Sequence, residues 1–389
     1  MKRALTFTFT LVLILCSSLL QAITVKGRVT AGTSPLPGVV VTDGYGFTIT
    51  DAKGRYSLQA HEKSGFIYIS TPAGYSNPVV DGVTKFFIPL EREGGKKSYD
   101  FNLNKKEMDD NHHGFVVVAD PQIYAAKEFP LLEAGVEDIK KTISAYKLPF
   151  HGIAPGDLIS HDHTLYPQYN SVMAKAGIPF YNVMGNHDMV NYGRSFETTQ
   201  WKFEQMFGPS YYSFNVGKIH YVVLNDCFYV GRDYYYIGYL EERQLSWLER
   251  DLAYLPKGST VVVSLHIPTT ISKKDRDKFS YEKAGTTMAN HKGLYKILEP
   301  YNTHIISGHM HTNHNEVISG NLFEHVTAAM SGAWWQGDLC TDGTPKGYGV
   351  YIANGDSLGW YYKSVGKPLS HQMRLYTGEI GRASCRERV

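Results

Sequence analysis

The sequence is poor in cysteine, lacks a long apolar run and carries no strong excess of charge. Only 4 of its 389 residues are cysteine, the formal net charge is +2, and no internal repeat or low-complexity tract stands out. The near-neutral charge offers no basic stripe of the kind that binds nucleic acid. Apolar residues make up 43% and aromatic residues 13% of the chain, which excludes a disordered protein and predicts a large core. A chain of this length is expected to hold two domains.

The first 22 residues have the pattern of a secretory signal peptide. A basic start, MKR, precedes the apolar run ALTFTFTLVLIL, and the segment ends in a small residue, Ala22. The apolar run is too short for a comfortable membrane span. We therefore expect cleavage after Ala22 and export to the periplasm or the exterior. A lipoprotein signal at Cys16 and an uncleaved anchor are the alternatives, and only these would bring the chain to a membrane.

The other end of the chain also departs from its surroundings. Residues 379–389, EIGRASCRERV, look like the in-frame translation of a sequencing adapter. We interpret them as a non-native tail, and we expect residues 363–378 to be the start of a truncated C-terminal region. A genuine basic tail is the alternative.

Removing the two terminal segments changes the charge and the cysteine count. The formal net charge falls from +2 to −1, because Lys2 and Arg3 leave with the first segment and three arginines and two glutamates with the second. Cys227 and Cys340 are then the cysteines that remain. In an oxidising compartment they could pair, and the sequence leaves that open.

Residues 23–104 are rich in Val, Ile, Tyr and Phe and are divided into short runs by turn residues. Runs such as ITVKGRVT, GVVVTD and GRYSLQA show no helical period, which predicts a small antiparallel β-sandwich. The segment resembles the carboxypeptidase-regulatory-like or transthyretin-like β-sandwich modules, through Gly38, Asp43, Asp51, Gly54 and Tyr56. That resemblance implies a scaffold, with carbohydrate binding as the alternative. Residues 105–113 are polar and are expected to form a linker that includes His112 and His113.

From residue 114 onward strands and helices alternate. Apolar runs such as FVVVAD, FHGIAPGD and IPFYNVMGNHD predict buried strands of an α/β sheet, and residues 128–146 and 240–255 have helical spacing. Further strands after Glu316 are expected to complete a second sheet. The carboxyl ends of such strands are where α/β sheets place ligands.

Polar side chains collect at these strand ends, in the motifs ADPQ, PGD, GNHD, SLH and SGHMH. They are Asp120, Gln122, Asp157, Asn186, His187, Asp188, His266, His309 and His311. Carboxylate, amide and imidazole groups without a thiolate suit Mn, Fe or Zn in an open site. Each motif alone is weak, since Asp and Asn cap turns and a single His is often a core residue. Together they supply enough donors for two metal ions if one carboxylate bridges them.

In their order and context the motifs resemble the calcineurin-like metallophosphoesterase family over residues 114–362. The resemblance implies a four-layer α/β/β/α sandwich, preceded here by the small all-β sandwich domain, and hydrolysis of a small-molecule phosphate ester or anhydride. It assigns one divalent metal ion to Asp120, Gln122, Asp157 and His311, and the other to Asp157, Asn186, His266 and His309. A metal-bridging hydroxide would be the nucleophile. His187 would assist the leaving group, and Asp188 would orient or charge-stabilise the His187 imidazole.

Gln122 departs from the family pattern, where His is the commonest residue. A Gln carbonyl oxygen is neutral and harder than imidazole, so the first metal ion should be held more weakly and Mn is favoured. Gln122 also leaves open a catalytically weakened cell-surface protein that binds glycans or polymers. The near-neutral charge disfavours a nuclease.

Other groups are weaker candidates. Arg194 follows GNHD and could meet a substrate phosphate. Trp334 and Trp335 lie in a loop rich in Gly and Asp and could wall a substrate pocket or close the sheet edge. The HDH sequence at residues 161–163 could fringe the cleft, and residues 228–240 are either an aromatic lid or ordinary packing. The oligomeric state is left open.

Overall fold

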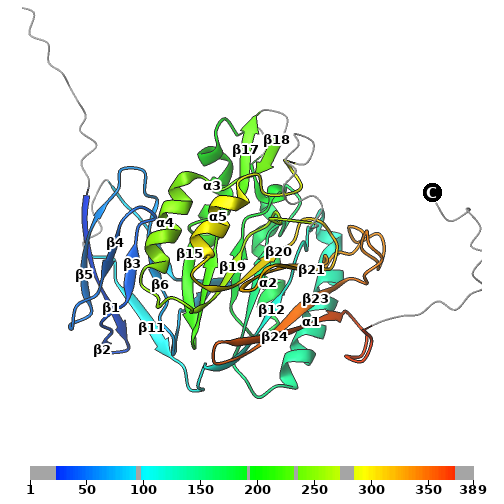
Figure 1. The fold of residues 1–389 in the computed structure, drawn as a ribbon, viewed down its shortest axis with the longest axis horizontal. Helices are drawn as coiled ribbons and strands as arrows, with labels where there is room; N and C mark the ends of the chain where they lie inside the picture. Colours follow the sequence, from blue (N-terminus) through cyan, green and yellow to red (C-terminus); the bar gives the residue numbers. More distant parts are fainter. Residues whose placement is uncertain (1–22, 93–97, 191–192, 232–234, 272–283, 373–389) are drawn as a thin grey trace, which may run out of the picture.

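A β-sandwich and a larger α/β domain lie side by side in the computed structural model, in the order that the sequence predicts (Figure 1). The structure describes residues 23–92, 98–190, 193–231, 235–271 and 284–372. The predicted signal peptide and the predicted non-native tail lie outside these residues. No helix in the described part of the chain is both long and apolar enough to cross a membrane.

The β-sandwich consists of two small sheets. One sheet contains β5 (Arg55–Ala60), β1 (Ile23–Ala31), β2 (Ser34–Pro35), β11 (Phe101–Lys105) and β7 (Tyr75–Ser76). The other contains β10 (Phe87–Pro89), β6 (Phe66–Ser70), β3 (Val40–Thr42) and β4 (Phe47–Ile49), and a short ribbon joins β8 (Val79–Val80) to β9 (Val83–Thr84). The prediction of a wholly antiparallel sandwich is wrong, because β1 and β11 pair in parallel. The rest of the domain forms the long crossover that such a pair requires.

The α/β domain is built on two further sheets. The first has the order β14 (Phe180–Val183), β13 (Phe150–Pro155), β12 (His112–Val117), β23 (Gly347–Asn354) and β24 (Ser357–Ser364). The second has the order β15 (Tyr212–Val216), β16 (Ile219–Val223), β19 (Thr260–Ser264), β20 (Asn302–Ser307), β22 (Leu322–Val326) and β21 (His314–Ser319). Strands β12, β13 and β14 run parallel in the first sheet, as do β16, β19 and β20 in the second. The carboxyl ends of these strands therefore gather at one edge of each sheet.

Aromatic side chains hold the two sheets face to face. Tyr181 of β14 stacks on Phe214 of β15 with ring centroids 3.6 Å apart, and Phe115 of β12 meets Tyr221 of β16 at 5.5 Å. All four side chains are buried. The edge-on contact of Phe115 with Tyr221 adds to the free energy gained by burying the rings.

Helices cover the outer faces of both sheets. They are α1 (Phe129–Ser144), α2 (Tyr166–Ala174), α3 (Phe196–Phe207), α4 (Glu242–Leu252) and α5 (His291–Leu298), with short 3₁₀ turns η1 (Ala126–Glu128), η2 (His163–Leu165) and η3 (Asn186–Asp188). Helix α1 buries residues at helical spacing and reaches the first sheet through Thr142, whose hydroxyl lies 2.7 Å from Tyr348 Oη. Helix α4 reaches the second sheet through Asp251, which accepts from Ser213 and pairs with His220, each at 2.8–2.9 Å. The predicted α/β/β/α layering is thus confirmed.

One smaller expectation fails. The sequence predicts His113 in a linker, yet His113 is fully buried in β12, with Nε2 2.6 Å from Tyr221 Oη and Nδ1 2.7 Å from the Asp110 carbonyl. A histidine can be buried when both ring nitrogens find partners, which composition alone does not reveal. The sequence leaves the pairing of Cys227 and Cys340 open, and in the structure both are free and buried.

The β-sandwich contacts the α/β domain through direct hydrogen bonds. Tyr211 Oη donates to the Gly44 carbonyl at 2.9 Å, and an Arg243 guanidinium nitrogen donates to Tyr45 Oη at 2.6 Å. Thr84 Oγ1 donates to the carbonyl of Phe180, the first residue of β14, at 3.0 Å. These contacts support a scaffolding role for the sandwich, because they hold it against elements that carry the strand ends described below.

Candidate metal centre

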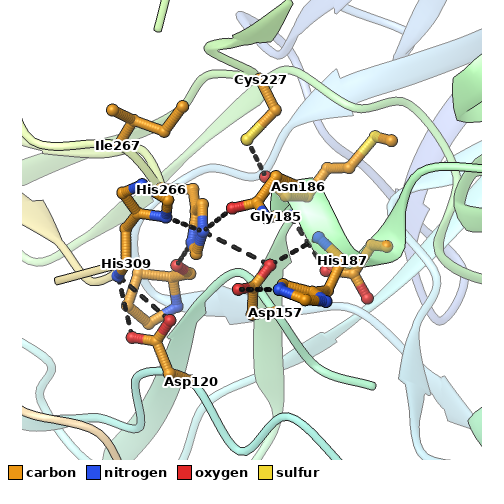
Figure 2. A network of polar contacts seen from close by, with 12 residues as sticks. Asp120, Asp157, Gly185, Asn186, His187, Cys227, His266, Ile267 and His309 are labelled. Atoms are coloured by element: carbon orange, nitrogen blue, oxygen red, sulfur yellow. Dashed lines mark hydrogen bonds and ion pairs between the residues drawn. The ribbon is translucent and has the colours of Figure 1, made fainter. Parts of the chain in front are cut away.

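The predicted metal ligands follow strands that end at one edge of the two sheets. Asp120 comes after β12, Asp157 after β13 and Asn186 after β14, while His266 follows β19 and both His309 and His311 follow β20. Although these residues are far apart in the sequence, Figure 2 shows most of them within one cluster of polar contacts. The parallel strand order is the reason, since it brings the carboxyl ends of neighbouring strands together.

Five of the seven predicted ligands have a left-handed backbone. The φ angles are +48° at Asp120, +42° at Gln122, +51° at Asp157, +67° at His309 and +50° at His311. Residues other than glycine adopt such angles rarely and at a cost on the order of 1–3 kcal/mol each. Strain of this kind gathers at functional sites, where the surrounding structure holds it in place.

Three histidines share one pattern of contacts. One ring nitrogen of each lies near a main-chain carbonyl: His266 Nδ1 is 2.8 Å from Pro155 O, His309 Nε2 is 2.8 Å from Gly285 O, and His311 Nδ1 is 3.2 Å from Gly332 O. The other nitrogen of each faces the cluster. Histidines that bind metals are held in this way, because a proton given to the carbonyl leaves a lone pair on the opposite nitrogen.

Asp157, His266 and His309 form the tighter half of the cluster. Their candidate donor atoms all lie within 4.8 Å of one another. His266 Nε2 is 3.3 Å from Asp157 Oδ1, 2.9 Å from Asn186 Oδ1 and 3.2 Å from His309 Nδ1. When the carbonyl-facing nitrogens carry the protons, two imidazole lone pairs point at each other, and a cation between them would relieve that repulsion. Together with Asn186, the three residues of this half therefore fit the second predicted metal ion.

Asp120, Gln122 and His311 form the looser half. His311 Nε2 lies 3.7 Å from Asp120 Oδ1. Gln122 is held by its main chain, whose N–H donates to the Asp157 carbonyl at 2.7 Å, and its buried side-chain oxygen has no hydrogen-bond partner. A buried oxygen without a partner is costly unless an ion or water satisfies it. The donors present, together with Asp157, thus fit the first predicted metal ion.

Burial and charge at the cluster also favour a cation. Burial lowers the pKa of His266, but the nearby Asp157 and Asp120 carboxylates outweigh it and raise that pKa to about 10. The pKa of Asp120 is raised above its usual range, chiefly by burial. The site therefore stabilises positive charge, and a divalent ion would supply it without a proton.

Two motif glycines leave room for the carboxylates. A Cβ on Gly185 would lie 2.0 Å from the Asp157 nitrogen and 2.3 Å from Asp157 Oδ1. A Cβ on Gly308 would lie 2.5 Å from Asp120 Oδ2. The glycines of GNHD and GHMH are therefore needed for close packing against the ligands, besides forming turns.

His187 lies beside Asp157 and is not part of the tight cluster formed by Asp157, His266 and His309. Its main-chain N–H donates to Asp157 Oδ1 at 2.8 Å, and its ring Nε2 lies 4.0 Å from Asp157 Oδ2. Its Nδ1 lies 3.4 Å from Ser160 Oγ. With 27% of the side chain exposed, the ring can meet a molecule bound at the cluster.

Asp188 holds the turn that carries His187. Its carboxylate accepts from the main-chain N–H groups of Gly185 and Leu158, at 2.9 and 3.3 Å, and from Tyr166 Oη at 3.0 Å. The expectation that Asp188 orients or charge-stabilises the His187 imidazole stays a prediction. The side chain turns back into the 3₁₀ turn and fixes the loop, and burial raises its pKa to about 7.

The HDH segment borders His187. The rings of His161 and His187 lie 4.5 Å apart, and the His161 N–H donates to the His187 carbonyl at 3.1 Å. His163 Nε2 lies 2.9 Å from the Asp188 carbonyl. The segment therefore borders the site, and the group of candidate metal donors, Asp157, His266 and His309, includes neither histidine.

The aromatic candidates lie on different sides of the cluster. Trp334 is 49% exposed and its ring lies 4.8 Å from that of His311, while Trp335 donates Nε1–H to the Pro121 carbonyl at 2.8 Å. In the described part of residues 228–240, for which the sequence leaves a lid and ordinary packing open, β17 (Cys227–Gly231) pairs with β18 (Tyr235–Gly238), and the Tyr236 ring lies 6.0 Å from His309. Arg194 is exposed, and its described contact is a main-chain bond to Thr198; the structure does not bring its side chain to the cluster.

Two buried carboxylates that the sequence analysis missed hold the ligand loops. Asp226 accepts from the N–H groups of His266 and Ile267 at 3.1 and 3.2 Å. Glu324 accepts from the N–H of Thr269 at 2.7 Å and from Ser307 Oγ at 3.3 Å, so it links the loop after His266 to the end of β20. Both are fully buried. The only sequence signal for Asp226 is its place directly after the apolar run YVVLN, another strand end.

Comparisons with known proteins match nearly the whole described chain. The family model described as Calcineurin-like phosphoesterase matches residues 114–313. Models described as the N terminal and the C terminal of Calcineurin-like phosphoesterase match residues 23–106 and 324–387. The last match runs beyond the described residues, into the segment that the sequence analysis set apart at 379–389.

Similar individual proteins include phosphatases. The Serine/threonine-protein phosphatase CPPED1 of Mus musculus is 28% identical over 158 residues, which are 40% of this chain and 47% of that protein, and the Homo sapiens protein gives the same values. The match thus spans about half the length of these curated relatives. A purple acid phosphatase PPD1 from yellow lupin (Lupinus luteus) seeds has a TM-score of 0.49 and 12% identity over 87% of this chain and 68% of that one. A dimetal phosphatase from Danio rerio has a TM-score of 0.43 and 15% identity over 65% and 96%.

Proposed function

Because the chain belongs to the calcineurin-like phosphoesterase family, we propose that it hydrolyses a small-molecule phosphate ester at a centre of two divalent metal ions. The observation that carries the proposal is the shared orientation of His266, His309 and His311. Each has one ring nitrogen near a main-chain carbonyl and the other turned to the cluster. This is how metal-binding imidazoles are held, and three such rings beside two buried carboxylates suit a dinuclear site.

We assign the residues to the two ions as the family resemblance implies. Asp120, Gln122 and His311 would hold one, Asn186, His266 and His309 the other, and Asp157 would bridge them. When bound, the ions would supply an activated water as nucleophile and neutralise the phosphoryl oxygens. Water attack forms a new P–O bond, breaks the bond from phosphorus to the alcohol oxygen, and requires a proton on that departing oxygen.

The position of His187 supports a role in delivering that proton. Its ring lies at the edge of the cluster, near Asp157 and Ser160, and is partly exposed. Asp157 fixes the position of His187 by accepting its main-chain N–H. We therefore propose that the His187 imidazole donates to the leaving oxygen, while Asp188 acts as a positioning residue by holding the turn that carries His187.

Substitution of His187 tests this role. In His187→Ala, turnover of a phosphomonoester should fall by about 100-fold or more, because general acid catalysis contributes on the order of 10²–10⁴. Bound metal should stay at the wild-type level, since His187 is not a ligand. Loss of metal together with activity would contradict the assignment. His163→Ala is a matched control, because His163 also borders the site but its ring nitrogen faces the Asp188 carbonyl.

A matrix of metals and substrates tests the function as a whole. Mn, Zn, Fe, Mg and Ca would each be added to the metal-free protein, with monoester, diester, nucleotide-sugar and phospholipid-headgroup substrates. The name of the similar serine/threonine-protein phosphatase makes monoesters the first class to try. We expect Mn to support the highest rate, since Gln122 offers a neutral oxygen. Metal-independent binding of glycans with no turnover would contradict the proposal and favour a weakened binding protein.

We also propose that the chain is exported. The support is the basic start, the apolar run and Ala22 in the first 22 residues. Expression with these residues in a secreting bacterium should give a released protein that begins at Ile23. Retention of Met1 in the cytosol would contradict export, and a lipid-modified N-terminus at Cys16 would instead show a lipoprotein.

A further inference from the structure

Trp334 is half exposed although it lies against a metal-ligand candidate. The indole ring centroid is 4.8 Å from that of His311, with 32° between the ring planes, and 49% of the residue is exposed. His311 Nε2 in turn lies 3.7 Å from Asp120. A single imidazole therefore separates the indole from the cluster, and a large apolar surface faces solvent beside it. Exposed aromatic surface next to a reactive site is typical of a binding surface.

The loop that presents Trp334 is held in a strained form. Trp334 and Trp335 are consecutive and have φ angles of +48° and +63°, which bulky residues rarely adopt. The segment is tied to the first ligand loop at two points: Ser331 Oγ donates to the Asp120 carbonyl at 2.8 Å and Trp335 Nε1 donates to the Pro121 carbonyl at 2.8 Å. These two hydrogen bonds join the loop that carries Trp334 to the loop that carries Asp120.

The two tryptophans differ in how their side chains are used. Trp335 packs against the core and satisfies its indole N–H on Pro121. Trp334 makes no hydrogen bond to any described residue, and its ring contact is with His311. Trp335 therefore anchors the loop, whereas Trp334 offers a rigid, planar surface to whatever occupies the site.

We propose that Trp334 is the floor of a leaving-group subsite that accepts planar, aromatic groups. This rests on the proposed hydrolysis and deepens it: the preferred substrates are phosphate esters whose alcohol carries an aromatic ring that stacks on the indole. Because aromatic stacking favours a flat ring over a saturated one of the same size, kcat/KM should favour the aromatic ester by roughly 3- to 10-fold. The alternative is that the indole only shields His311 from water.

A pair of matched esters separates these roles. Benzyl phosphate and cyclohexylmethyl phosphate have six-membered rings on a primary carbon and differ chiefly in planarity. We expect the wild-type, Mn-loaded protein to prefer benzyl phosphate. Trp334→Leu should abolish the preference, and Trp334→Phe should keep part of it. Trp360→Leu is the control, because Trp360 is 40% exposed but contacts His304 and His325, outside the site.

Binding measurements provide a readout that does not depend on turnover. Calorimetry with benzylphosphonate and cyclohexylmethylphosphonate should show the same preference in the wild type and its loss in Trp334→Leu. Equal affinities, equal kcat/KM values or a preference that survives in Trp334→Leu would overturn the subsite. A drop in Mn affinity of Trp334→Leu with the preference intact would show shielding and would also overturn it. Absence of turnover with a preserved binding preference would count against the proposed hydrolysis alone.

Discussion

The main-chain N–H of His309 donates to both carboxylate oxygens of Asp120, at 3.0 and 2.9 Å. His309 follows β20 and Asp120 follows β12, so this contact joins the two sheets at their common edge. It also fixes the loop from which the His309 ring reaches the cluster. The geometry of the candidate metal centre therefore depends on the way the two sheets pack. Substitutions that move the ends of their strands should lower the affinity for metal.

Gln122 should be a ligand of the weaker metal site. Replacing it with Leu keeps a similar volume but removes the buried oxygen, so affinity for the more weakly bound Mn ion should fall by about 10–100-fold. Gln122→His should raise affinity for Zn at the same site, because imidazole binds Zn well. Titration of the metal-free proteins would measure both effects. Unchanged stoichiometry and affinity in Gln122→Leu would show that Gln122 holds no metal.

Gly185→Ala should disrupt the cluster through packing. The added methyl group would meet Asp157 at 2.0–2.3 Å, which forces the loop or the carboxylate to move. We expect a loss of stability of about 1–3 kcal/mol in chemical unfolding, as for other overpacked sites, together with lost metal. Gly65→Ala is the control, since a Cβ there meets nothing within 4 Å. Equal stability and metal content in both variants would contradict the account.

Asp226 should act on metal affinity without touching metal. In Asp226→Asn the remaining oxygen can still accept a hydrogen bond from the N–H of His266. The new NH₂ group would face the N–H of Ile267, and two donors cannot bond to each other, so the loop that carries His266 should become more mobile. Changes in such supporting residues cost about 10–100-fold in metal affinity. Asp138→Asn is the control, because Asp138 also accepts several hydrogen bonds but lies on α1. A circular dichroism spectrum like that of the wild type with normal Mn affinity would rule out this role for Asp226.

His151 should make the protein less stable in mild acid. It is buried among Phe115, Phe214 and Tyr221, and burial lowers its pKa well below the usual value. Below about pH 6.5 the unfolded chain therefore binds a proton that the folded chain does not, and stability is lost as the pH falls. His151→Phe should remove this loss, with a benefit at pH 5 that exceeds its benefit at pH 7.5 by up to about 2 kcal/mol.

Chemical unfolding of the metal-free proteins at the two pH values measures that difference. The metal-free form is needed because protons compete for the metal ligands. His112→Phe is a control, because His112 is exposed and lies at the start of β12, the strand that pairs with the strand of His151. A stability difference between His151→Phe and the wild type that does not change with pH would contradict the prediction.

Much of this site could be predicted because each ligand follows an apolar strand. The runs that end at Asp120, Asp157 and Asn186 are buried on both faces, and buried parallel strands place their ends together. The pattern therefore identified the sheets and predicted the candidate donors. It did not identify helix α3, whose first turn is capped by Ser195 and whose residues are mostly polar or aromatic. The apolar signal that marks a helix is weak there.

The remaining differences depend on long-range contacts. Asp188 neighbours His187 in the sequence, but its carboxylate turns to Gly185, Leu158 and Tyr166 because those donors are buried around it. Glu324 supports a loop 54–55 residues away and belongs to no motif. The parallel pairing of β1 with β11 joins the two ends of a domain. None of these contacts leaves a periodic pattern in the sequence.

Anomalous scattering from crystals grown with Mn tests the central claim most directly. The account predicts two peaks on either side of the Asp157 carboxylate, roughly 3.5–4 Å apart. One peak should lie near His266 and His309, and the other near Gln122 and His311. No peak at this edge of the sheets under metal-replete conditions, or peaks bound to other residues, would contradict the dinuclear centre and the hydrolysis derived from it.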